Sequence, residues 1–280
     1  MEPISLSVVI TSAAVGAFTN KLIDKGEQWL IDLVGSHSPA VQKKARENFQ
    51  NFLNRLAKRV ELLESELPSS QKKIFDDALD HPGTSLLMQN AMLNAAITDN
   101  DDRHTILSEM IAQRLTAGAD DMITLIGAAA CDVTNSLASK HIKLLGLMAY
   151  LFSIRPSEIP VITEQKEYDE YLLSFWKNLE VLSDDLDNVT PFDFIHLQGV
   201  SCVSYNPSIR QSLAIMLKLP VKSKKFEITM AEFEKLSWWN KVTNLWGKGI
   251  TYSNITSVGT LIGILYYDSI TKTKTHIDLD

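Results

Sequence analysis

Cysteine is scarce in this chain, and its scarcity excludes one class of protein. Only Cys131 and Cys202 occur among 280 residues. Small secreted domains that are held together by disulfides use more cysteines in much shorter chains. Both residues stand among apolar or small neighbours, where reduced cysteines pack as small hydrophobic side chains. The sequence therefore predicts two unlinked, buried thiols in a cytoplasmic protein.

Positive charge is also in short supply. Lysine and arginine number 27 against 34 aspartates and glutamates, which gives a formal net charge of −7. Proteins that bind nucleic acid concentrate lysine and arginine against the phosphates. The charge balance therefore argues against nucleic acid as the main partner.

Recognisable catalytic motifs are missing. The sequence has no phosphate-binding Walker loop, no dinucleotide-binding glycine pattern, no histidine pair at zinc-ligand spacing and no nucleophile elbow. Its densest acidic cluster is Asp99, Asp101 and Asp102, followed by His104. The cluster lacks the glycine and the final glutamate of a calcium loop, so we interpret it as the capping of a helix N-terminus.

We accordingly predict no catalytic, cofactor-binding or metal-binding residues, and a protein that is not an enzyme. The alternative is an enzyme whose site is assembled from dispersed residues. Cys131 and Asp132 with His141 could form such a site, but they lie in segments that are predicted to be buried, which favours a structural role.

Apolar runs long enough to cross a bilayer are missing as well. The uncharged segments 3–20 and 249–267 come nearest, but serine, threonine and asparagine dilute both. Glu2 stands where a signal peptide would carry basic residues, so a cleaved signal is not expected. For residues 249–267 we favour a buried helix, with membrane contact after activation as the alternative.

Helical periodicity dominates what the sequence does contain. Residues 4–34 and 39–67 are each predicted to form one long helix, with Gly35 between them and a proline at the start of the second. The second helix carries one apolar stripe at alternating spacings of four and three. The pair is predicted to form an antiparallel hairpin, with a coiled-coil dimer as the alternative. The stripe consists of Phe49, Leu53, Leu56, Val60 and Leu63.

The predicted fold is mainly α, a multi-helix bundle with a long N-terminal helical hairpin and a smaller α+β C-terminal part. Residues 1–67 form the hairpin, residues 68–155 a helical core, and residues 156–280 a helical region with a few short strands. Within the core, segments 122–133 and 142–154 are apolar nearly all round, as in the centre of a bundle.

Beyond residue 200, short strands are expected at 201–205, 226–229 and 275–280. A single helix is expected from about residue 230 to residue 246.

Three basic residues are the first candidates for contact with a partner. Lys43 and Lys44 lie away from the apolar stripe of the second helix, and Arg46 flanks it. We expect them to carry a surface for a protein partner or for self-association.

Aromatic and glycine residues near the C-terminus are the second group of candidates. Trp238, Trp239 and Trp246 belong to an aromatic, basic helix, which is read either as packing or as a surface that binds a partner. Gly259 and Gly263 are four residues apart, so on a helix they share one face and allow another backbone to approach closely.

Residues 256–263, Thr-Ser-Val-Gly-Thr-Leu-Ile-Gly, precede a tail with Ile-Asp-Leu at residues 277–279. This C-terminus resembles that of the uncharacterised bacterial "LPO/Vpar" proteins, and the rhythm of the helical middle, residues 89–147, is similar. Residues 264–268 replace a more basic stretch that the resemblance leads us to expect. The resemblance implies a setting among phage-defence genes, and it supplies no functional residues.

The leading hypothesis is a non-enzymatic interaction or sensor protein in bacterial anti-phage defence that acts through protein partners. It rests on the missing catalytic chemistry, the helical hairpin and the tryptophan-rich C-terminal region, and its defence setting on the resemblance. A membrane-acting effector, either pore-forming or recruited to the membrane on activation, is the alternative that segments 3–20 and 249–267 suggest.

Overall fold

The computed structural model describes residues 30–32, 34–66, 68, 74–75, 77–78, 81–117, 121–222 and 226–275. Contacts within the chain divide it into two compact units, with the boundary between Ser136 and Leu137. The uncharged segment 3–20, most of the first hairpin helix and nearly all of the tail strand expected at 275–280 lie outside the described residues.

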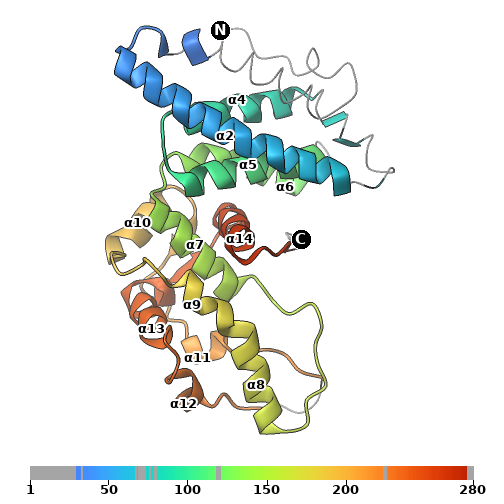
Figure 1. Ribbon diagram of the computed structural model, residues 1–280. Helices are drawn as coiled ribbons and strands as arrows, with labels where there is room; N and C mark the ends of the chain where they lie inside the picture. Colours follow the sequence, from blue (N-terminus) through green and yellow to red (C-terminus); the bar gives the residue numbers. More distant parts are fainter. Residues whose placement is uncertain are drawn as a thin grey trace. The chain divides into compact units, whose positions relative to one another are not determined.

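The described elements of the N-terminal unit are all helices. Helix α2 (Pro39–Glu66) packs on α4 (Pro82–Ala96) and on α5 (Asp101–Thr116), as Figure 1 shows. Helix α6 (Met122–Thr134) packs on the same two helices. Helices α4 and α5 therefore form the centre of this unit.

The apolar stripe of α2 faces this centre, as its periodicity predicts. Phe49, Leu53, Leu56 and Val60 are buried, and Leu63 at the end of the stripe is half-buried. Burial of such side chains is worth about 1.5–3 kcal/mol each relative to exposure. The stripe therefore accounts for much of the attachment of α2 to α4 and α5.

The C-terminal unit is built around a different pair of helices. Helix α7 (Ser139–Phe152) and helix α14 (Ser257–Thr271) make the most extensive helix contact of the described chain. Short elements surround this pair: α8 (Gln165–Phe175), η2 (Trp176–Asn178), α9 (Leu179–Leu182), α10 (Pro191–Gly199), α11 (Leu213–Met216), α12 (Met230–Phe233), α13 (Trp239–Lys248) and η3 (Ile250–Tyr252).

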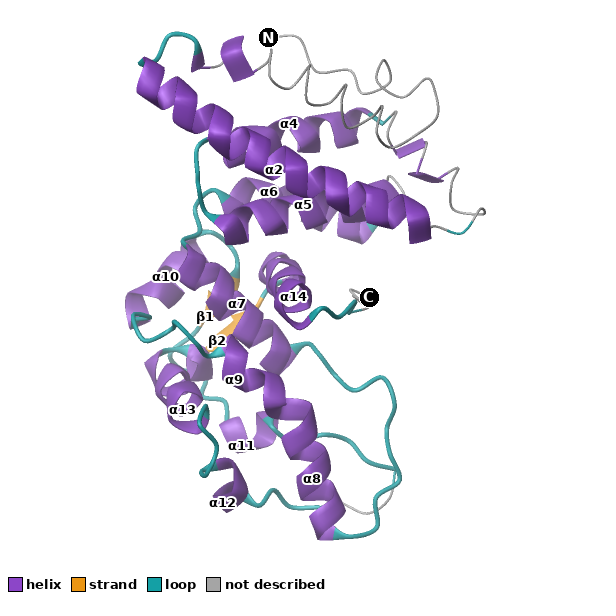
Figure 2. Cartoon of the chain, in the orientation of Figure 1, coloured by secondary structure: helices purple, strands orange, loops and turns teal. Residues whose placement is uncertain are grey.

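Two short strands complete the C-terminal unit (Figure 2). Strand β1 (Val203–Tyr205) pairs antiparallel with β2 (Ser253–Ile255), so that Ser204 lies opposite Asn254. The prediction of a mainly α fold with a small β part near the C-terminus is confirmed.

Three local expectations are wrong. Residues 226–229 form no strand, because side chains of α8 bind this segment: Gln165 Nε2 donates to the Glu227 carbonyl at 2.8 Å, and the Thr229 hydroxyl donates to Asp169 at 3.0 Å. The helix expected from residue 230 to residue 246 is divided into α12 and α13. The break lets Phe233 and Trp238 both turn inward, where their rings meet edge to face at 5.9 Å.

The third concerns residues 249–267, which do not form one helix. The segment contains η3 and β2 before α14 begins. The reason is long-range pairing, because the Asn206 amide donates to the Tyr252 carbonyl at 2.8 Å and the Gln211 amide to the Thr251 carbonyl at 2.9 Å. A helix would use these carbonyls internally.

The unit boundary falls inside the segment 68–155 that the sequence analysis treats as one helical core. Of the two apolar helices in that segment, α6 packs in the N-terminal unit, whereas α7 packs with α14 in the C-terminal unit.

Candidate binding site

A depression of about 490 Å³ lies on the C-terminal unit and is taken as the candidate site. This volume lies within the range of about 300–1,000 Å³ that is usual for ligand sites. Three segments contribute its walls, namely the stretch that leads into α11, the start of α12 and one face of α13. The described residues that line it are Arg210, Gln211, Ser212, Leu213, Ala214, Met230, Trp239, Thr243 and Trp246.

Helix α13 supplies the aromatic wall. Trp239, Thr243 and Trp246 are spaced by four and three residues, so they share one face of the helix. Trp246 also stacks on Phe152 of α7, with ring centroids 6.2 Å apart, and keeps only 8% of its surface exposed. The wall is therefore held by the core of the unit on its inner side.

The wall that residues 210–214 form is held by hydrogen bonds to η3 and β2. Gln211 Nε2 donates to the Ser253 carbonyl at 3.1 Å and to Asn254 Oδ1 at 2.7 Å. The Thr251 hydroxyl donates to the Gln211 carbonyl at 2.9 Å. Backbone and side chain of Gln211 are thus both fixed, and the neighbouring Arg210 and Ser212 are carried on an anchored segment.

Some polar groups of the depression already form hydrogen bonds within the protein, and others do not. The Thr243 hydroxyl donates to the Trp239 carbonyl of its own helix at 2.9 Å. Arg210 and Ser212 are exposed, and no described residue forms a hydrogen bond or an ion pair with either side chain. The depression therefore presents one guanidinium and one hydroxyl to a ligand, above a largely apolar surface.

A second polar cluster, in the same unit, joins the start of α7 to the start of α10. His141 Nε2 donates to Asp193 Oδ1 at 2.9 Å, and Lys140 Nζ approaches the same oxygen at 2.7 Å. Asp193 Oδ2 accepts from the amide and the hydroxyl of Thr190 at 2.7 and 2.9 Å. The ring of His196 stacks on His141 with centroids 4.7 Å apart.

The ionisation of this cluster suits a structural role. Burial opposes ionisation of Asp193, but hydrogen bonds from Lys140, Thr190 and His141 outweigh it and hold the pKa of this carboxyl well below its usual range. Burial lowers the pKa of His141, and the Ala138 amide donates to its Nδ1 at 3.1 Å. Both ring nitrogens of His141 and both oxygens of Asp193 are thus occupied.

The cysteines are poor nucleophiles. Cys131 and Cys202 are free and buried, and burial raises the pKa of each thiol to about 12. A thiolate is therefore strongly disfavoured at neutral pH. Cys131 and His141, which a dispersed catalytic site would need together, belong to different units.

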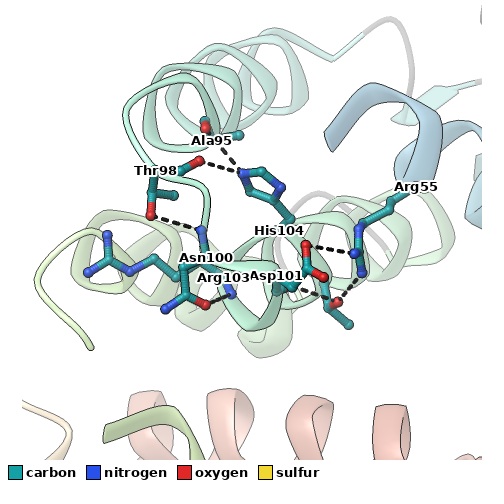
Figure 3. A network of polar contacts seen from close by, with 8 residues as sticks. Arg55, Ala95, Thr98, Asn100, Asp101, Arg103 and His104 are labelled. Carbon is teal, nitrogen blue, oxygen red and sulfur yellow. Dashed lines mark hydrogen bonds and ion pairs between the residues drawn. The ribbon is translucent and has the colours of Figure 1, made fainter. Parts of the chain in front are cut away.

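The acidic cluster near residue 100 is part of a capping network, which Figure 3 shows. Asn100 caps α5 by accepting from the Arg103 amide at 3.1 Å. Asp101 pairs with Arg55 of α2 at 2.8 Å, and His104 Nε2 contacts the carbonyls of Ala95 and Thr98. Within the described part of the chain, no group of histidine, cysteine, aspartate and glutamate residues is arranged to hold a metal ion.

The structure separates the basic candidates of the sequence analysis from the aromatic ones. Lys43, Lys44 and Arg46 are exposed on α2 of the N-terminal unit, where Lys43 lies 3.9 Å from Glu47 and Lys44 lies 3.0 Å from Asp99. The tryptophans belong to the C-terminal unit.

Of the three tryptophans, two line the depression and one does not. Trp239 is half-buried and Trp246 nearly buried, and both belong to its wall. Trp238 is 3% exposed and packs on Phe233.

Gly259 and Gly263 lie at tight contacts inside the C-terminal unit. A Cβ on Gly263 would stand 2.3 Å from the Leu145 carbonyl oxygen of α7, and a Cβ on Gly259 would stand 2.0 Å from the Cys202 carbonyl oxygen. Real Cβ atoms do not approach backbone oxygens so closely. The structure thus places both glycines where two backbone segments meet.

Sequence reasoning missed Arg210, Gln211 and Met230 as members of the candidate site. No motif surrounds them, and the first two enter the site only because their segment pairs with residues 251–254. The sequence offers one signal, which is the charge of Arg210 in a stretch without neighbouring acids.

Comparison with known proteins adds a family. A family model with the description ":-like" matches residues 24–228, which is more than half of the chain. The chain belongs to this family. Its description states no activity, so the expectation of an uncharacterised family is confirmed at this level. No curated protein and no solved structure matches the chain.

Proposed function

We propose that this protein is a non-enzymatic interaction or sensor protein of bacterial anti-phage defence, and that a protein partner binds at the depression of the C-terminal unit. The observation that carries the binding role is the composition of its walls. Tryptophan and arginine are enriched among the residues that carry most of the binding energy at protein interfaces, and methionine is enriched at interfaces in general. Trp239, Trp246, Met230 and Arg210 all line this depression.

Binding is favoured over catalysis because the two cysteines and the histidine–aspartate pair of the described chain are already engaged. The thiols of Cys131 and Cys202 are buried in their protonated form. The histidine–aspartate pair of His141 and Asp193 has its nitrogen and oxygen atoms occupied by structural hydrogen bonds. The defence setting rests on the resemblance of residues 256–263 to the "LPO/Vpar" proteins.

A phage-plating assay tests this proposal. Bacteria that express the protein with its neighbouring genes are expected to resist phage, and Trp239→Ala is expected to lose that resistance at an unchanged protein level. Phe192→Ala is the matched control, because Phe192 is an aromatic residue of the same unit that is 79% exposed and does not line the depression. Full protection by Trp239→Ala would contradict the proposal.

Membrane contact after activation is the second candidate, and the uncharged sequence of residues 3–20 favours it. No helix among the described residues is long and apolar enough to span a bilayer. Leakage of dye from liposomes measures this candidate directly. Release by the full chain, and its loss when lysines replace Val8 and Val15, would favour a membrane-acting effector over the partner-binding role.

A further inference from the structure

The charge of the depression indicates what kind of partner it takes. Arg210 is the one charged residue among the described residues that line it. Its guanidinium is exposed, and no described residue pairs with it. An arginine fork binds carboxylates through two parallel hydrogen bonds, and such charge-assisted bonds are stronger than those between neutral groups. The depression is therefore complementary to a carboxylate.

The remaining surface of the depression is complementary to an apolar side chain. Trp239 and Met230 are half-buried, and Leu213 and Trp246 keep at most 9% of their surfaces exposed. Indole faces and a methionine side chain offer a polarizable contact surface that adapts to aliphatic or aromatic groups. Apolar and charged features thus adjoin in one depression of about 490 Å³.

The wall that carries Arg210 is formed before a ligand arrives. Gln211 is tied to η3 through its backbone and to β2 through its side chain. The Ile209 amide donates to the Asn206 carbonyl at 3.1 Å. The backbone on both sides of Arg210 is therefore held, and binding needs to order only its side chain. Such preorganisation lowers the entropic cost of binding.

From these features we infer that the depression binds an acidic peptide segment of the partner, with a carboxylate on Arg210 and a neighbouring apolar side chain on Trp239 and Trp246. This inference rests on the proposed function, because it specifies the chemistry of the surface that the partner presents.

Selection from a library of random hexapeptides on the full-length protein tests the inference. We expect the selected peptides to be enriched in aspartate or glutamate next to an aromatic or aliphatic residue. A synthetic peptide of the enriched sequence, measured by fluorescence polarisation, should bind Arg210→Gln about tenfold or more weakly, since each lost charge-assisted pair costs about one order of magnitude or more in affinity.

Charge reversal sharpens the test and keeps it independent of folding. Arg210 is exposed, so Arg210→Glu should fold normally, and selection on this variant should enrich lysine or arginine beside the same apolar residues. Enrichment that ignores charge, equal selections on the wild type and Arg210→Glu, or no enrichment on the wild type would each overturn the inference.

The phage assay separates this inference from the proposed function. If Trp239→Ala loses protection but Arg210→Glu keeps it, the depression serves defence and the acidic ligand is wrong. If both variants protect fully although acidic peptides bind, the ligand class stands and the proposed role in defence is wrong.

Discussion

The two units of this chain reach a packed core by different routes. In the N-terminal unit, α2 and α6 each pack on α4 and α5, and the helices in contact follow closely along the sequence. In the C-terminal unit the central pair is α7 and α14, the first and the last helix of that unit. The core of this unit is complete only when α14, near its C-terminal end, packs on α7 at its start.

The two units also differ in the contacts that hold their helices together. Within the N-terminal unit, His104 ties the end of α4 to α5 through two carbonyl contacts, and Arg59 joins α2 to Glu109 of α5 at 2.7 Å. Side chains also reach across the C-terminal unit, as from His141 to Asp193 at 2.9 Å. Its helix contact differs in that Gly259 and Gly263 leave out a side chain where two segments meet.

The largest expected effect tests this reliance on glycine. Gly263→Ala should destabilise the C-terminal unit by about 1–3 kcal/mol or more, because its Cβ would meet the Leu145 carbonyl oxygen and the Ala149 Cβ at 2.3 and 2.7 Å. In α6 of the N-terminal unit, a Cβ on Gly127 would meet no atom within 4 Å. Gly127→Ala should therefore stabilise its unit by about 0.5–1 kcal/mol through helix propensity.

Thiol labelling measures the two units separately, because each contains one free, buried cysteine. In Gly263→Ala, Cys202 should react faster with a thiol reagent while the rate at Cys131 stays unchanged. Equal acceleration at both cysteines would show that the units do not open independently. Both thiols should react in denaturant without reductant.

The second prediction concerns acid and the N-terminal unit. His104 is 1% exposed, burial lowers its pKa below the ordinary 6.5, and its Nδ1 is buried without a partner among the described residues. Arg55 opposes its protonation, whereas Asp101 and the carbonyls of Ala95 and Thr98 favour it. Below about pH 6.5 His104 binds a proton in the unfolded chain but resists protonation in the folded unit. The contribution of His104 to stability should therefore be fully present above this pH and fall as the pH decreases.

Urea unfolding at pH 7.5 and pH 5.5, followed by labelling of Cys131, measures this loss. His104→Gln keeps a side-chain donor and should remove most of the pH dependence, which amounts to at most about 1.4 kcal/mol per pH unit for one proton. In the C-terminal unit burial likewise lowers the pKa of His141 while its hydrogen bond to Asp193 raises it, so the loss reported by Cys202 should have the same sign. An unchanged pH dependence in His104→Gln would contradict the assignment.

A smaller effect is expected for ion pairs. Arg59 and Glu109 are each 23% exposed, so their coupling energy in a double-mutant cycle should be about 1 kcal/mol. Lys235 and Glu232 of the C-terminal unit form an equally short pair at 2.6 Å, but the side chains are 66% and 41% exposed. Their coupling should stay below about 0.5 kcal/mol. A reversed order of the two energies would show that burial does not govern these pairs.

The smallest effect on folding is expected at the basic surface of α2. Replacement of Lys43, Lys44 and Arg46 by glutamate should change the free energy of unfolding by less than about 0.5 kcal/mol for each site, because all three are exposed. We expect the same change to weaken association, measured as the mass of the complex by light scattering. Reversal of Lys58 on the same helix is the control, and an unchanged mass in the triple variant would count against this surface.

The sequence pattern alone predicts those features in which the buried positions follow the period of one helix or strand. The stripe of α2 could be read from residue spacing, because a helix of 3.6 residues per turn places its buried positions at fixed intervals. The burial of α7 could be read from its nearly continuous apolar sequence. The prediction that residues 122–133 lie in the centre of a bundle is wrong, because Met122 and Leu125 of α6 are 57% and 60% exposed. The start of α5 at an acidic cluster and the strand near residue 203 were accessible in the same way, from capping and β-branched residues.

Only the tertiary structure decided how these elements are combined. It divided residues 230–246 into two helices, paired β1 with β2, and brought Arg210 beside Trp239 in one depression. The physical reason is that a sequence period encodes which face of an element is buried, whereas the partner of that face depends on shape and on closing long stretches of chain. Gly263 illustrates both parts, since its place on α14 follows from spacing and its contact with Leu145 follows only from the packing of α7 on α14.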